Sequence, residues 1–280
     1  MGKYMKNKKV VIVVIAAVFA AAAILFFRRE NQEPIEIFAL SAIVVDINSG
    51  QVLYEKNPHL RLLPSSITKL AALLPVFEAI EDGRISFDTE VTVSLRAAMV
   101  FASQAGFVAD DVATVHGLIM ASMLPSGSEA IMALGEHLYG TEEDFVDAIN
   151  ETMARLGMEN THFTSSAGLD GAEHFTTAYD IFLLARHFMA YHPAIFEFTS
   201  NEFYVYHLPG GGHLHLRNTN DMLRFDGING LKTGSSPESG SSLVFTFERG
   251  RTSQVYVVLS APGHSMRRHD TELLFRRFGG

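Results

Sequence analysis

Residues 41–54 read SAIVVDINSGQVLY, in which two short apolar runs flank a polar turn sequence. The runs 41–46 and 51–54 contain the β-branched and aromatic side chains that favour strands. The INSG sequence at 47–50 has the Asn, Ser and Gly that tight turns prefer. We therefore predict a β-hairpin over these residues.

A second hairpin is predicted near the other end of the chain. The apolar runs 242–247 and 254–260 flank ERGR at 248–251, and both runs have the composition of strands. Strands at both ends with helices between them predict an α/β fold, with one antiparallel β-sheet flanked by helices in a single domain. The segments with helical spacing of apolar residues are 66–80, 115–123, 129–139, 142–156, 178–187 and 270–277.

The composition excludes several classes of protein. The 280 residues include no Cys, so the chain has no disulfide framework, no thiol nucleophile and no Cys ligand for zinc. The formal net charge of −9 argues against a nucleic-acid-binding protein, which needs a basic surface. Apolar residues make up 48% of the chain, which suits a folded globular protein.

The charge is divided unevenly along the chain. Residues 1–29 hold six basic residues and no acidic one, for +6, whereas the remaining 16 basic and 31 acidic residues sum to −15. Residues 10–27 are all apolar, and as a helix they would span roughly 27 Å, close to the hydrocarbon thickness of a bilayer. We predict a signal or membrane-anchor segment at 1–29, a linker at 30–37 and a domain at 38–280 outside the cytoplasmic membrane. Small residues at 20–23 leave open a cleaved signal and a secreted protein.

Ser66-Ile67-Thr68-Lys69 is the first of three short motifs that carry chemistry. A Ser in the first turn of a helix lies near unpaired backbone N–H groups and the positive end of the helix dipole. Lys69, three residues on, shares its helix face, and a neutral Lys can remove the hydroxyl proton that makes a Ser a weak nucleophile. The alternative is an ordinary N-terminal helix Ser beside a solvated Lys.

The other two motifs are weak signals when taken alone. Ser126-Gly127-Ser128 follows an apolar run and has the composition of a turn. Lys232-Thr233-Gly234 precedes Ser235 and a strand-like segment. A Lys-Thr pair can bind a carboxylate, and a glycine on a strand lets a substrate backbone lie close.

In their order and surroundings, the three motifs resemble those of the D-alanyl-D-alanine carboxypeptidase family, the low-molecular-weight penicillin-binding proteins or serine DD-peptidases. The resemblance covers roughly residues 38–278. Its further landmarks are SAIVVD at 41–46, VLYEKN at 52–57, LGMENTHF at 156–163, SAGL at 166–169, TAYD at 177–180, RNTN at 217–220 and GLKTG at 230–234.

The resemblance implies an antiparallel sheet between helical layers and a mechanism of acyl transfer. Ser66 would attack the carbonyl between two D-Ala residues of a peptidoglycan stem peptide, with Lys69 as its base. Ser126 would relay a proton, and Lys232 would lie close to these groups. Water would then hydrolyse the acyl-enzyme.

The resemblance also implies the substrate contacts. The backbone N–H groups of Ser66 and Ser235 would form the oxyanion hole. Thr233 and Arg267, the neighbour of Arg268, would bind the terminal carboxylate, and Gly234 would lie beside the substrate backbone. The implied partners are stem peptides, β-lactam antibiotics as covalent inhibitors, and the membrane through the N-terminal helix, with no cofactor, no metal and no nucleic acid.

Two features depart from the family pattern. Ser128, which we expect to contact the substrate, stands where the family usually has an Asn that holds the substrate's amide. We therefore expect acylation with weakened substrate positioning, and a catalytically weakened wall-binding homologue remains an alternative. Many relatives continue into a small β domain and a membrane-seeking tail, whereas this sequence stops at Gly280. That favours the N-terminal apolar segment as the membrane tether.

Other enzyme classes remain as alternatives. A zinc DD-peptidase would use His ligands, but the sequence has no H-E-x-x-H, and His213 and His215 follow a Gly-rich stretch typical of an exposed hairpin. A serine β-lactamase would need a dedicated carboxylate for deacylation, which the sequence does not identify. A DD-endopeptidase that cleaves peptidoglycan cross-links shares all three motifs, so the motifs do not separate it from a carboxypeptidase.

Overall fold

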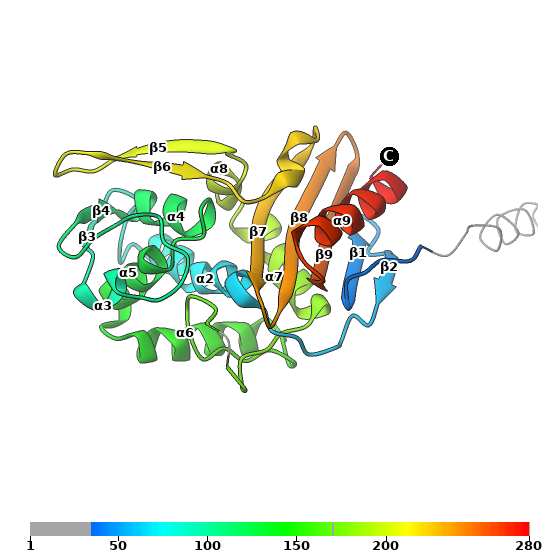
Figure 1. The fold of residues 1–280 in the computed structure, drawn as a ribbon, viewed down its shortest axis with the longest axis horizontal. Helices are drawn as coiled ribbons and strands as arrows, with labels where there is room; N and C mark the ends of the chain where they lie inside the picture. Colours follow the sequence, from blue (N-terminus) through cyan, green and yellow to red (C-terminus); the bar gives the residue numbers. More distant parts are fainter. Residues whose placement is uncertain (1–34, 170, 280) are drawn as a thin grey trace, which may run out of the picture. The chain divides into compact units, whose positions relative to one another are not determined.

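A five-stranded antiparallel sheet organises the computed structural model, which describes residues 35–169 and 171–279. The order of its strands is β2-β1-β9-β8-β7, so both ends of the chain contribute, as predicted. Figure 1 shows β1 and β2 beside the late strands β8 and β9. The strands are β1 (Ser41–Asp46), β2 (Val52–Lys56), β7 (Ile228–Ser236), β8 (Gly240–Arg249) and β9 (Thr252–Ala261).

Both predicted hairpins are confirmed. The first pairs β1 with β2, and the second pairs β8 with β9 over nearly their whole length. The two hairpins meet where β1 pairs antiparallel with β9, with Val44 opposite Tyr256. Strand β7 is an edge strand of this sheet, which leaves one side of its backbone without a strand partner.

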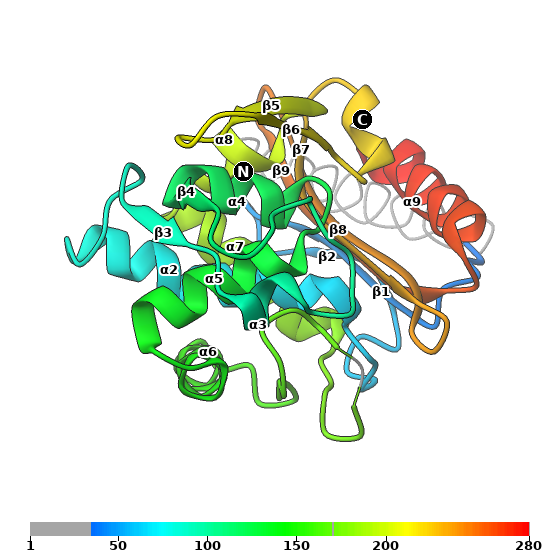
Figure 2. The same cartoon turned by 60° about the vertical axis from the view of Figure 1, so that its left-hand side comes forward.

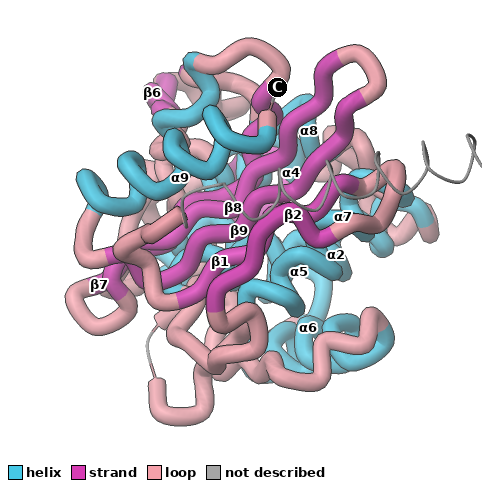
Figure 3. The backbone as a smooth tube through the Cα atoms, turned by 90° about the vertical axis from the view of Figure 1, so that its right-hand side faces the viewer, coloured by secondary structure: helices cyan, strands magenta, loops and turns pink. Residues whose placement is uncertain are grey.

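Helices cover both faces of the sheet. Figures 2 and 3 show α9 (His264–Phe278) on one face and α7 (Ala178–Tyr191), with the remaining helices, on the other. Strands covered on both sides read as nearly continuous apolar runs. Accordingly, Val255–Leu259 of β9 are all fully buried. The predicted fold class, an antiparallel sheet flanked by helices, is confirmed.

The helical half of the unit Phe38–Gly280 surrounds α2, which is buried on all its faces. Helices α4, α6 and α7 each follow a Thr whose hydroxyl accepts a backbone N–H three residues later, which satisfies an otherwise unpaired donor. Two small ribbons, β3–β4 and β5–β6, complete this half. The elements are η1 (Ser65–Ile67), α2 (Thr68–Glu81), β3 (Glu90–Thr92), α3 (Leu95–Ala98), β4 (Val112–Thr114), α4 (Val115–Met123), α5 (Ser128–Tyr139), α6 (Glu142–Arg155), α8 (Ile195–Thr199), β5 (Phe203–His207), β6 (His213–Arg217) and η2 (Asp221–Arg224).

Two of the predicted helices begin two or more residues away from the expected position. The helix expected over 66–80 opens with the short 3₁₀ turn η1 and continues as α2. The last helix, expected from 270, begins at His264, because the buried polar residues Arg267, Asp270 and Thr271 obscure its apolar period. The predicted anchor at 1–29 lies outside the described residues. Within 35–169 and 171–279, no helix combines the length and apolar character needed to span a bilayer.

Candidate active site

Ser66 lies in the 3₁₀ turn η1 that leads into the central helix α2. The preceding residue, Ser65, has a φ of 46°, a conformation that residues other than glycine seldom adopt. Strand β7 runs beside this turn, and a Cβ on Gly234 would lie 2.7 Å from the carbonyl oxygen of Pro64. Gly234 is therefore required for the close approach of β7 to the nucleophile turn, a role that the sequence analysis did not foresee.

Lys69 is completely buried beneath Ser66. Its Nζ donates to Ser66 Oγ at 3.0 Å and to the carbonyl oxygen of Ala167 at 2.8 Å. Burial lowers the pKa of the Lys69 ammonium to about 7, and the attraction of the Glu129 carboxylate opposes this fall. Near neutral pH a large fraction of Lys69 is therefore neutral and able to accept the Ser66 proton.

Glu129 is a fully buried carboxylate that the sequence analysis missed. Its Oε1 accepts backbone N–H groups from Ala105, Gly106 and Phe107 at 2.6, 2.9 and 3.3 Å. The side chain thus fixes the loop at the rim of the site and places a negative charge near Lys69. Its signal in the sequence was a Glu directly after Ser128, in the first turn of a helix, where carboxylates are stabilised.

Ser126 and Ser128 occupy different environments. Ser126 has a left-handed φ of 71°, lines the cleft, and has a hydroxyl without a hydrogen-bond partner among the described residues. Ser128 is the first residue of α5 and is completely buried, and its hydroxyl also has no partner in that part of the chain. Its expected contact with the substrate stays a prediction, since Ser128 does not line the cleft.

Lys232 is buried at the centre of β7. Its Nζ donates to the carbonyl oxygen of Thr233 at 3.1 Å. Burial lowers the pKa of Lys232 well below its ordinary range, and the positive charges of Lys69 and Arg267 lower it further. Thr233 itself lies 2.6 Å, oxygen to oxygen, from the hydroxyl of Thr219 in the RNTN segment.

Arg267 projects from α9 and is only 4% exposed. One of its amino groups donates to Asp221 at 3.1 Å, and Arg268 donates to the other oxygen of Asp221 at 2.9 Å. The Nε of Arg267 is buried and has no partner among the described residues. Burial lowers the pKa of Arg267, and the Asp221 carboxylate opposes the shift. Arg267 also lines the cleft.

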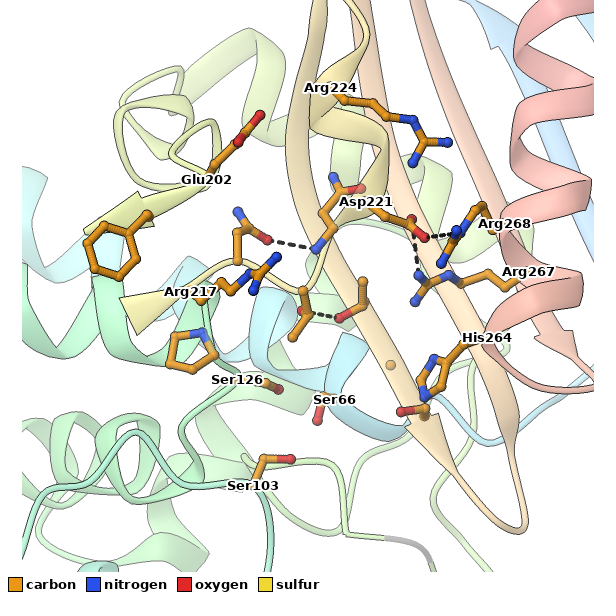
Figure 4. A pocket seen from close by; sticks show the side chains of 18 residues that line it. Ser66, Ser103, Ser126, Glu202, Arg217, Asp221, Arg224, His264, Arg267 and Arg268 are labelled. Atoms are coloured by element: carbon orange, nitrogen blue, oxygen red, sulfur yellow. Dashed lines mark hydrogen bonds and ion pairs between the residues drawn. The ribbon is translucent and has the colours of Figure 1, made fainter. Parts of the chain in front are cut away.

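These groups surround a cleft of about 1050 Å³ that opens over Ser66. Figure 4 shows Ser66 and Ser126 below the Arg217 side chain, with Arg267, Arg268 and Asp221 clustered to one side. The structure thus brings Ser66, Ser126, Thr233, Gly234, Ser235 and Arg267 together in the wall of the cleft, with Lys69 and Lys232 buried. Cleft residues for which the sequence predicts no role in the site include Ser103, Glu202, Arg217, Asp221 and His264.

The histidines noted in the sequence lie on the β5–β6 ribbon. His213 and His215 are exposed on β6, and their ring centroids are 4.9 Å apart. Among residues 35–169 and 171–279, no group of three or more His, Cys, Asp or Glu side chains is arranged to hold a metal ion.

Comparison of the sequence with known proteins finds one matching peptidase family and similar curated proteins. The sequence profile of a peptidase family, described as D-alanyl-D-alanine carboxypeptidase, matches residues 28–263. The chain is 32% identical to D-alanyl-D-alanine carboxypeptidase DacF of Bacillus subtilis over 80% of its own length and 57% of the relative's. It is 28% identical to DacD of Escherichia coli over 87% and 64% of the two chains. The chain therefore spans less than two thirds of the length of these curated relatives.

Solved structures agree with the fold. The crystal structure of DacD from Francisella tularensis superposes with a TM-score of 0.82 at 26% identity, covering 89% of this chain and 74% of that one. Penicillin-binding protein D2 of Listeria monocytogenes, in a cefotaxime-bound form, superposes with a TM-score of 0.78 at 29% identity. That comparison covers 88% of this chain and 98% of that one.

Proposed function

The chain belongs to the D-alanyl-D-alanine carboxypeptidase family, and we propose that it removes the terminal D-Ala from peptidoglycan stem peptides through an acyl-enzyme on Ser66. The observation that carries the proposal is the 3.0 Å hydrogen bond between Lys69 Nζ and Ser66 Oγ, with the pKa of Lys69 lowered to about 7. This pairing supplies a nucleophile and a base in one buried turn of helix.

Acylation starts when neutral Lys69 removes the hydroxyl proton and Ser66 Oγ attacks the carbonyl carbon of the penultimate D-Ala. The negative charge that develops on the carbonyl oxygen is stabilised by the backbone N–H groups of Ser66 and Ser235. The proton passes through the Ser126 hydroxyl to the departing amine, the C–N bond breaks, and D-Ala leaves. Water then adds to the ester carbonyl, which releases the shortened peptide and returns the proton to Ser66.

The carboxylate of the terminal D-Ala is proposed to bind at Thr233 and Arg267. The paired hydroxyls of Thr233 and Thr219 offer short, neutral hydrogen bonds at the cleft wall. Arg267 and Arg268 share the single carboxylate of Asp221, so this cluster keeps a net positive charge at the cleft. A free carboxylate at the end of the peptide is therefore the recognition element.

The same Ser66 is proposed to be acylated by β-lactam antibiotics. These compounds carry a strained amide in place of the scissile peptide bond and a carboxylate in a position similar to that of the terminal D-Ala. The similarity to a penicillin-binding protein whose structure holds cefotaxime supports this.

The stem peptide lies outside the cytoplasmic membrane. We therefore place the domain there and retain residues 1–29 as the proposed signal or membrane anchor, on the strength of their apolar run and positive charge.

A second candidate function, DD-endopeptidase, is favoured by one observation. Arg217, Glu202 and Phe203 also line the cleft, and Figure 4 shows Glu202 and Arg217 on the side away from Arg267 and Arg268. Neither Arg217 nor Glu202 forms an ion pair with the described part of the chain. Charged groups on that side of the cleft suit a leaving group larger than D-Ala, as in a cross-linked peptide.

One experiment separates these functions. The protein is incubated with a stem pentapeptide and with a cross-linked dimer, and the products are identified by mass. Loss of one D-Ala from the pentapeptide supports the carboxypeptidase, cleavage of the dimer to monomers supports the endopeptidase, and neither reaction would refute both. The Ser66→Ala variant is the control and is expected to be inactive on either substrate.

A further inference from the structure

A buried chain of hydrogen bonds connects the nucleophile turn to the loop that follows α6. Thr68 Oγ1 donates to the carbonyl oxygen of Ser65 at 2.8 Å. His174 Nε2 lies 2.9 Å from the same Thr68 Oγ1, and His174 Nδ1 accepts the backbone N–H of Thr164 at 2.9 Å. Thr68 and His174 are both completely buried. The sequence predicts no role for either residue.

The direction of each hydrogen bond follows from the partners. A carbonyl oxygen only accepts, so the single Thr68 hydroxyl proton points to Ser65 and its oxygen must accept from His174. His174 Nε2 therefore carries a proton, and Nδ1 is bare because it accepts a backbone N–H. This is a neutral imidazole in one tautomer. Burial lowers the pKa of His174 to about 4, with a smaller contribution from His162, so the ring stays neutral at physiological pH.

The Ser65 carbonyl matters because it shares a peptide plane with the backbone N–H of Ser66. In a planar trans peptide the C=O and N–H bonds point in opposite directions, so fixing one fixes the other. The φ of 46° at Ser65 makes this peptide unit costly to hold without support. Gly168 packs against the same carbonyl, and a Cβ at that position would lie only 2.0 Å from the oxygen.

We infer that Thr68 and His174 are positioning residues that aim the Ser66 N–H into the oxyanion hole. The inference rests on the proposed function, in which that N–H is one of two donors to the developing negative charge. Because an oxyanion-hole donor acts when charge develops, its misalignment slows acylation and leaves the initial binding of the ligand largely unchanged.

The test compares Thr68→Val, which has nearly the same shape but no hydroxyl, with Thr68→Ser, which keeps the hydroxyl. Stopped-flow acylation by a fluorescent penicillin separates the dissociation constant of the initial complex from the acylation rate constant. We expect Thr68→Val to lower the rate constant at least tenfold, compared with about 10²- to 10³-fold for complete loss of such a donor. The initial complex should change less than twofold, and Thr68→Ser should resemble the wild type.

A double-mutant cycle tests whether His174 acts through Thr68. His174→Phe keeps a buried ring but removes both nitrogens, so it should reproduce the slow acylation of Thr68→Val, and the double variant should be no slower than either single one. Equal acylation rate constants for Thr68→Val and Thr68→Ser would overturn the positioning role alone. Wild-type protein that penicillin does not acylate would overturn the proposed function and this role together.

A measurement on the unaltered protein covers the case in which the variants fail to fold. The ¹⁵N chemical shifts of the His174 ring report which nitrogen carries the proton. The inference requires a protonated Nε2 and a bare Nδ1 at neutral pH. A protonated Nδ1 would overturn the hydrogen-bond chain.

Discussion

Burial is the main cause of the low pKa of Lys69, and the buried carboxylate of Glu129 opposes it, so Glu129 raises the pH at which Lys69 becomes a base. Lys69 must be neutral to take the Ser66 proton, and the nearby negative charge favours its protonated form. Replacing Glu129 by Gln removes the charge but keeps an oxygen that can accept from Ala105, Gly106 and Phe107. The acid limb of the acylation rate is therefore expected to move to lower pH in Glu129→Gln.

The size of the shift follows from the burial of both groups. Even at a separation of about 10 Å, two unit charges at an effective dielectric of about 20 interact by roughly 1.7 kcal/mol. This energy corresponds to a shift of about one unit in the pKa of Lys69. For a Lys69 pKa of about 7 in the wild type, a fall of one unit raises the neutral fraction at pH 6 about fivefold. Well above pH 8 the two proteins should acylate at nearly the same rate.

The assay is the rate of acylation by a fluorescent penicillin between pH 5 and 9 at constant ionic strength. Glu142→Gln is the matched control, because Glu142 is also a buried carboxylate but hydrogen-bonds to Ser166 and makes no contribution to the pKa shift of Lys69. Its acid limb should stay where the wild type has it. An acid limb of Glu129→Gln that stays in place or moves to higher pH would contradict the electrostatic effect of Glu129 on Lys69.

Three further predictions concern stability and geometry. Lys69→Met should abolish acylation yet raise the free energy of unfolding below pH 7, because lowering the Lys69 pKa from 10.5 to about 7 costs the folded wild type roughly 5 kcal/mol. This gain in the free energy of unfolding should shrink as the pH rises from 7 to 10.5. Calorimetry of both proteins at pH 6 and at pH 10 checks the difference. Ser128 does not line the cleft and its buried hydroxyl has no partner in the described chain, so Ser128→Ala should acylate within about twofold of the wild type and unfold at a similar or slightly higher temperature; a large loss of acylation would instead support the substrate contact expected from the sequence. Gly168→Ala should slow acylation, because a Cβ 2.0 Å from the Ser65 oxygen displaces that peptide, and wild-type kinetics would count against the tight contact.

The elements that could be predicted from sequence are those with a regular period. The two hairpins of the sheet and helix α4, found at Val115–Met123 as expected, have uninterrupted strand or helix patterns. The β5–β6 ribbon was foreseen as an exposed hairpin but not as a wall of the cleft. The histidines on its outer face are polar and give no apolar pattern from which a packed inner face could be predicted. Tyr206 on the inner face is nevertheless buried.

The residues of the site likewise fall into those that the sequence predicts and those that it does not. Ser66, Lys69 and Lys232 belong to short motifs whose spacing is fixed by one helix turn or one strand, so the sequence predicts them. Glu129 and His174 contribute through loops that only the folded chain brings together: Glu129 binds a loop more than twenty residues away, and His174 reaches Thr68 across 106 positions. No local pattern encodes such partners.

The proposed function requires that Ser66 becomes covalently acylated. Intact-mass analysis of the protein after exposure to benzylpenicillin, followed by peptide mapping, detects this adduct. We predict a single penicilloyl adduct on the peptide that contains Ser66, present in the wild type and absent in Ser66→Ala. No adduct in the wild type, or an adduct that persists in Ser66→Ala, would contradict the account.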